Sequence, residues 1–150
     1  TSFACGCPPR FALRRGLPRA LGIYMRYHDY HLDKYEVSKG GETIAFYLVY
    51  EYPEEETDKS VITFTDVALY NFTHTAGAII TDIYDEPVRE FISKWGKEIQ
   101  EWNRMQGVRY FKDSLEDYAS SLESEGYKAW VIESAIGFYG FVIAKGVANA

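Results

Sequence analysis

A Gly40-Gly41 pair between two strand-forming segments constrains the fold more than any other feature of the sequence. The flanking segments, His28–Lys39 and Glu42–Tyr52, are rich in Tyr, Val, Ile and Phe, and the two glycines suit the positive φ angles of a tight turn. We therefore predict a β-hairpin. Its register places the following residues opposite each other: Val37 and Ile44, Tyr35 and Phe46.

Farther from the turn this register is unfavourable, because it places the charged residue Asp33 opposite Leu48 on the apolar face. A one-residue bulge at Asp33-Lys34 removes the conflict, since an extra residue moves the preceding side chains to the other face. With the bulge, the apolar face carries Leu32, Tyr30 and His28. Asp29 and His31 then lie together on the opposite face.

Four further segments have the composition of strands: residues 60–74, 78–84, 128–134 and 141–145. We predict a turn at Ala76-Gly77 between the first two and another through residues 136–140 between the last two. Together with the hairpin, these segments predict an antiparallel sheet of about six strands.

Two helices are expected between these strands. Asp85, Glu86 and Pro87 are typical of a helix start, and we expect this helix to end at Gly107. Its apolar residues recur at steps of three and four: Val88, Phe91, Ile92, Trp95, Ile99 and Trp102. The second helix starts at Asp113 or Ser114, with a capping acid, and stops at Gly126. The predicted fold class is α+β, with both helices packed on one face of the sheet.

Residues 1–24 differ from the rest, with four arginines, no acid and no hydrophobic period. We interpret them as a basic leader, added in cloning or translated from upstream sequence, with residues 25–150 as one domain. Without those four arginines, 12 of the 16 basic residues remain against 22 acidic ones, a charge of −10. Such a body repels phosphate backbones, which argues against nucleic-acid binding, and attracts a basic protein.

No stretch approaches the ~20 apolar residues of a membrane span, and Phe11 to Gly22 lacks the apolar region of a secretory signal. We therefore expect a cytoplasmic protein without membrane association. Cys5 and Cys7 both lie in the leader, and two sulfurs alone do not complete a metal site. No cofactor is expected.

The candidate catalytic and metal-binding residues centre on the three histidines: His28, His31 and His74. With Asp29, Asp33 and Asp66 they offer the ligand types of a His/carboxylate metal site. Asp29 and His31 share a strand face, and such a pair orients an imidazole for general-base catalysis. No nucleophile or phosphate-binding motif accompanies them, so a small His/Asp-assisted or metal-dependent enzyme is the alternative hypothesis.

Tyrosines and acids gather around the hairpin, and the tyrosines are too many for all to be buried. Exposed tyrosine beside acidic residues is typical of a protein-binding surface. Three consecutive glutamates also lie in the polar loop of residues 53–59. The predicted partner-binding residues are Asp29, His31, Glu51, Glu54, Glu55 and Glu56.

Several patterns between Tyr27 and Val147 carry a family resemblance: His28-Asp29-x-x-Leu32, Phe64-x-Asp66-Val67-x-x-Tyr70-x-Phe72, Gly77-x-Ile79-Ile80-x-Asp82-Ile83 and Ile132-x-Ser134-x-x-Gly137-x-x-Gly140-x-Val142-x-Ala144. In these patterns the chain resembles a loosely defined group of small bacterial proteins, regarded in part as immunity proteins of polymorphic toxin systems. The resemblance implies a small acidic binder that neutralises a cognate toxin without catalysis of its own. A homo-oligomeric structural protein is a third hypothesis.

Overall fold

The computed structural model describes residues 24–25, 27–105 and 114–150. In chain order the elements are β1 (Tyr24–Met25), β2 (His31–Ser38), the 3₁₀ turn η1 (Lys39–Gly41), β3 (Thr43–Tyr50), β4 (Asp58–Pro87), α1 (Val88–Met105), α2 (Leu115–Ser124) and β5 (Lys128–Asn149). The fold is α+β with an antiparallel sheet and two helices, as predicted. The leader, apart from Tyr24, lies outside the described residues. None of the described helices is long and apolar enough to cross a membrane.

Strands β4 and β5 form one long antiparallel ribbon, paired from Ile62 opposite Asn149 to Pro87 opposite Lys128. The sheet has five strands, since β1, β2 and β3 also pair with β4. The prediction of about six strands is wrong, because four predicted segments merge pairwise into two long strands. These segments are residues 60–74 and 78–84 of β4, and residues 128–134 and 141–145 of β5.

The ribbon bends where Gly77 and Gly137 approach each other. Both have positive φ angles, 77° and 82°, which glycine adopts without steric cost. A Cβ atom on Gly137 would lie 2.8 Å from the Cα atom of Ala78, so the two backbones are closer than side chains allow. The register also shifts between His74 and Ile79. The predicted turn at Gly77 is therefore a bend shared by two strands that stay paired.

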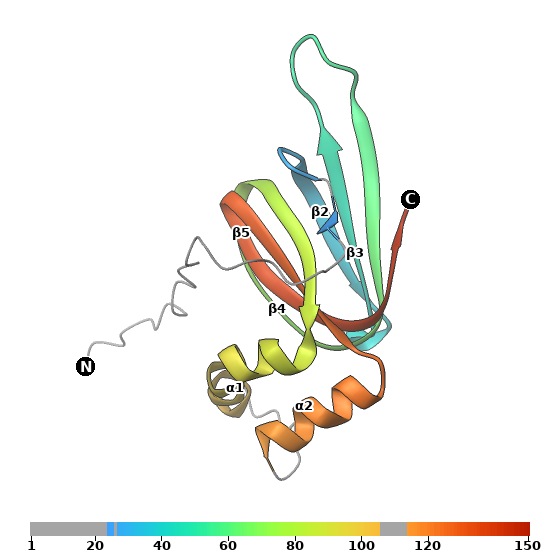
Figure 1. The fold of residues 1–150 in the computed structure, drawn as a ribbon. Coiled ribbons are helices and arrows are strands. Elements are labelled where there is room, and N and C mark those ends of the chain that lie inside the picture. The colour runs from blue at the N-terminus through green and yellow to red at the C-terminus, as the bar shows by residue number, and fades with distance from the viewer. Residues whose placement is uncertain (1–23, 26, 106–113) are drawn as a thin grey trace, which may run out of the picture.

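The β2–β3 hairpin bridges the two arms of β4. Strand β3 pairs with the first arm along residues 58–65, and His31 of β2 pairs with Ile79 of the second arm. Because β2 also pairs with β3, the sheet curls round on itself (Figure 1). A single curled sheet thus encloses a core of its own.

The hairpin register is as predicted. Two predicted cross-strand pairs are confirmed: Val37 with Ile44, and Tyr35 with Phe46. The register shifts between Leu32 and Lys34, which confirms the bulge and buries Leu32. The connection is longer than a two-residue turn, because Lys39 joins the glycines in a 3₁₀ turn with a φ of 51°.

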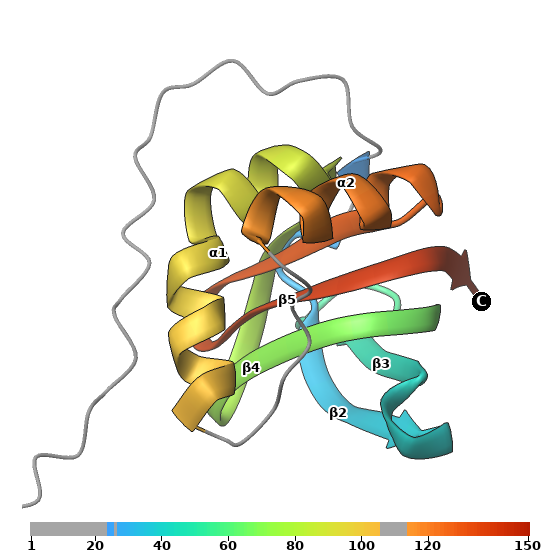
Figure 2. The same ribbon diagram turned by 90° about the horizontal axis from the view of Figure 1, so that it is seen from below.

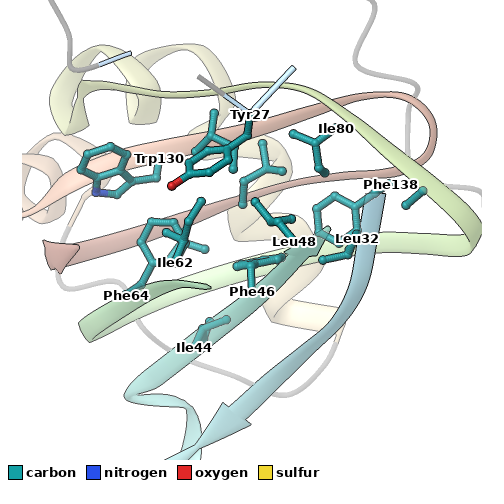
Figure 3. Packing of buried hydrophobic residues seen from close by; sticks show 14 of the residues in the cluster. Tyr27, Leu32, Ile44, Phe46, Leu48, Ile62, Phe64, Ile80, Trp130 and Phe138 are labelled. Carbon is teal, nitrogen blue, oxygen red and sulfur yellow. The ribbon is translucent and has the colours of Figure 1, made fainter. Parts of the chain in front are cut away.

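Buried side chains form two clusters on opposite faces of the β4–β5 ribbon. The sheet core fills the curled sheet (Figure 3) and includes Leu32, Ile44, Phe46, Leu48, Ile62, Phe64, Ile80, Trp130, Ile132 and Phe138. The helix core includes Leu69, Phe91, Ile92, Ile99, Tyr118, Leu122, Val131, Phe141 and Ile143. Successive residues of β5 alternate between the two cores, so both faces of this strand are covered.

The two helices lie side by side over one face of the ribbon (Figure 2), as predicted. In α1 the buried stripe continues from Ile99 to Asn103, four residues on, so Trp102 is 38% exposed and its predicted packing is wrong. In α2 the side chain of Ser114 accepts a hydrogen bond from the backbone N–H of Asp117 (3.1 Å), which confirms the predicted start. Gly107, the predicted stop of the first helix, lies outside the described residues.

Candidate functional site

The connection between β3 and β4, residues 51–57, projects from the end of the sheet away from the helices (Figure 1). Its four glutamates, at position 51 and positions 54–56, are all exposed. The start of β2 lies beside it, because His31 pairs with Val49 near the end of β3. The predicted partner-binding residues therefore come together at this end of the hairpin.

Four tyrosines and one histidine form a continuous row of ring contacts here. The centroid distances are 5.2 Å from Tyr27 to Tyr30, 5.3 Å from Tyr30 to Tyr50, 4.8 Å from Tyr50 to Tyr52 and 5.6 Å from Tyr52 to His31. The rings meet edge-on or tilted, as the quadrupole of aromatic rings favours. Tyr27 is buried and the other four are partly exposed. This tyrosine row thus runs from the sheet core to the surface.

Two tyrosines of the tyrosine row lie beside carboxylates. Tyr30 donates to Oδ2 of Asp58 at 2.6 Å, and the carboxylate of Glu55 lies beside Tyr50. The hydrogen bond to Asp58, together with desolvation, raises the pKa of Tyr30 to about 12. The interaction with Glu55, together with desolvation, likewise raises the pKa of Tyr50 to about 12. The hydroxyl of Tyr30 holds the carboxylate of Asp58 in place.

His28 and Asp29 contact each other just before β2. Nε2 of His28 lies 3.5 Å from Oδ1 of Asp29, and Nδ1 lies 3.1 Å from the carbonyl oxygen of Thr81. The hydroxyl of Tyr52 donates to the backbone carbonyl of Asp29 (2.8 Å), whose φ is 66°. Strand alternation does not orient these residues, because β2 begins only at His31. The side chain of His28 is 64% exposed, so the inward position predicted for it is wrong, and the contact of Asp29 is with His28.

The other predicted metal-binding residues have separate surroundings. The ring of His74 contacts Tyr35 and Phe138, with centroids 5.6 and 5.5 Å away. Asp33 and Asp66 are exposed. Among the residues that the structure describes, no group of three or more His, Cys, Asp or Glu side chains is arranged to hold a metal ion. The contact that the structure does show among the catalytic candidates is that of His28 with Asp29.

Asp58 is a residue of this site that the sequence does not single out, because it lies in the polar stretch of residues 53–59. In the structure it is the first residue of β4 and pairs with Tyr50. The sequence did contain a signal for it. If the pairing of β3 with β4 is continued two residues beyond Ser60, Asp58 comes to lie opposite Tyr50. The pairing of each tyrosine with a particular carboxylate depends on packing across three strands and had no local signal.

Comparison of the chain with protein-family models, with curated proteins and with solved structures found no match.

Proposed function

We propose that the protein binds a positively charged protein through the tyrosine row and the acidic β3–β4 connection, as an immunity protein binds its cognate toxin. Residues 51–58 contain five acidic residues and no lysine or arginine. This segment projects beyond the end of the sheet (Figure 1), and all five of its acidic residues are exposed. Such a concentration of charge speeds the approach of a partner of opposite sign.

The observation that carries the proposal is the hydrogen bond from the hydroxyl of Tyr30 to Asp58. A hydrogen bond from a neutral phenol fixes a carboxylate in position without neutralising its charge. Among the described residues, neither Asp58 nor Glu55 forms an ion pair with a lysine or arginine. The site therefore combines fixed negative charge with partly exposed aromatic rings, which are the groups enriched where protein interfaces gain most of their affinity.

The test is binding to the purified product of the gene adjacent to the one for this chain. We expect a complex whose association rate falls as NaCl is raised from 50 to 500 mM, on the order of tenfold or more, because salt screens the attraction. Reversing the charges of Glu51, Glu54 and Glu56 to lysine should slow association further. If the neighbouring protein is a toxin, co-expression of this chain should restore growth.

The matched control reverses three exposed glutamates on the helices, Glu90, Glu98 and Glu116. Both triple variants change the net charge equally, so only a local role of the β3–β4 connection separates them. Equal slowing by both variants, or no binding at all, would contradict the proposal.

A further inference from the structure

The hairpin contains one tyrosine–carboxylate pair that already holds a cation. Tyr47 donates its hydroxyl to Oε2 of Glu36 (3.0 Å), and Nζ of Lys34 pairs with Oε1 of the same carboxylate (2.6 Å). The same Nζ lies 4.4 Å from the centroid of the Tyr47 ring. The ammonium group thus gains an ion pair and a cation–π contact at once. The hydrogen bond with Glu36 is also the main cause of a raised pKa at Lys34.

Tyr30–Asp58 and Tyr50–Glu55 repeat two of these three groups. Each has a partly exposed tyrosine ring beside a carboxylate, and in the first pair the hydroxyl of Tyr30 donates to Asp58. Within the described part of the chain, the cation–π contacts are those of Lys34 with Tyr47 and of Lys145 with Tyr127. Lys34 therefore supplies a cation to the Tyr47–Glu36 pair, whereas no described residue supplies one to Tyr30–Asp58 or Tyr50–Glu55.

A fourth tyrosine–carboxylate pair lies against the helix core. Tyr84 donates to Oε1 of Glu133 (2.8 Å), but Tyr84 packs against the helix core and has further contacts. In the two pairs at the projecting end of the hairpin, by contrast, both carboxylates are exposed and both tyrosines are partly exposed.

We propose that Tyr30–Asp58 and Tyr50–Glu55 are adjacent sockets for two basic side chains of the protein partner, each held as Lys34 is held on Tyr47 and Glu36. The inference rests on the proposed function and names the feature of the partner that is recognised. The two rings are 5.3 Å apart, so the two basic side chains must be close together. Residues i and i+2 of an extended segment lie about 6.6 Å apart on one face and meet this requirement.

The probe is the peptide acetyl-Gly-Arg-Gly-Arg-Gly-amide, titrated into the ¹⁵N-labelled full chain at low salt. The comparison peptide, acetyl-Arg-Gly-Gly-Gly-Gly-Arg-amide, has the same charge with the arginines far apart. We expect the first peptide to bind more tightly and to shift the amide signals of residues 30, 50, 55 and 58. Equal affinity for the two peptides, or shifts elsewhere on the protein, would overturn the inference.

Neutral variants separate the sockets from general charge. The double change Glu55→Gln and Asp58→Asn should weaken peptide binding about tenfold, because each socket loses its ion pair. Glu36→Gln is the matched control, since its carboxylate is already occupied by Lys34. It should leave the dissociation constant within about a factor of two.

A gain of binding provides the sharpest test. Lys34→Ala empties the third pair, and Lys34 is exposed, so the fold should tolerate the change. The peptide should then also shift the signals of Tyr47 and Glu36. If it does not, the occupied trio is not a template for the other two pairs and the inference fails.

The two proposals fail separately. Suppose that the adjacent gene product binds and that reversing Glu51, Glu54 and Glu56 slows its association. If the peptide then binds the Glu55/Asp58 variant as tightly as the wild type, only the sockets are refuted. If the peptide occupies the sockets but the gene product does not bind, only the proposed function is refuted.

Discussion

Single residues set how closely the strands of the ribbon approach. Gly146 lies directly opposite Thr65 in the β4–β5 pairing. A Cβ atom on Gly146 would overlap the hydroxyl oxygen of Thr65 and would meet no other atom closer than the Cβ of Thr65, at 3.8 Å. The absence of a side chain at position 146 therefore accommodates one particular hydroxyl group.

Gly146→Ala should lower the free energy of unfolding by about 1–3 kcal/mol, because the added methyl group forces Thr65 out of its rotamer. Thr65→Ala removes the overlapping oxygen, so in that background Gly146→Ala should cost almost nothing. Urea denaturation of the four proteins of this double-mutant cycle measures the coupling. An unchanged cost in the Thr65→Ala background would place the strain in the backbone.

The start of α2 is the clearest example at the level of elements. Ser114 has an extended backbone and its hydroxyl accepts from the N–H of Asp117, so one otherwise unpaired donor of the first turn is satisfied. Replacing Ser114 with alanine should lower the free energy of unfolding by about 1 kcal/mol. Ser93→Ala, at an exposed position inside α1, is the control and should be neutral or slightly stabilising. Equal effects of the two changes in thermal denaturation would contradict a capping role.

Elements with local signals were predicted well. The α2 cap, the hairpin register and the bulge beside Lys34 each follow from periodicity or from a conflict between neighbouring residues. The bend at Gly77 was not predictable in the same way, because Ala-Gly also suits a reversal. Strand β4 does not reverse at Gly77 because it stays paired with β5, which bends at Gly137, about 60 residues later in the chain. That information is not local.

The candidate site was predictable in composition but not in pairing. The acidic residues and tyrosines were identified from their density around the hairpin. The orientation of His28 was predicted by extending strand alternation past the end of β2, where the backbone of Asp29 turns to a φ of 66°. Alternation assigns faces only within a strand, so residues 28 and 29 were outside its reach.

At the scale of the whole molecule, the two cores share the same two strands. Phe46 belongs to the sheet core and Phe91 to the helix core, yet both cores pack against β4 and β5. Neither face of the ribbon can be exposed without weakening the pairing that supports the other. We therefore expect the described part of the chain to unfold as one cooperative unit.

That expectation can be measured with one variant in each core. Phe46→Ala and Phe91→Ala should each lower the free energy of unfolding by about 3–5 kcal/mol. In both variants, loss of far-ultraviolet circular dichroism and of near-ultraviolet aromatic signal should share one urea midpoint. A helical signal that is lost before the aromatic signal in Phe91→Ala would show that the helix core unfolds on its own.

The ribbon of β4 and β5 also has a consequence for the order in which the protein folds. Its pairs nearest the helices join residues 41 positions apart, as in Pro87 with Lys128, whereas Ile62 and Asn149 at the far end are 87 positions apart. Closing the shorter loop costs less chain entropy, and each pair formed shortens the loop for the next. We expect the ribbon to zip outward from α1 and α2, and such non-local pairing is slow. Until β5 has been synthesised, β4 emerges from the ribosome with one long edge unpaired, which makes the nascent chain a natural client for chaperones.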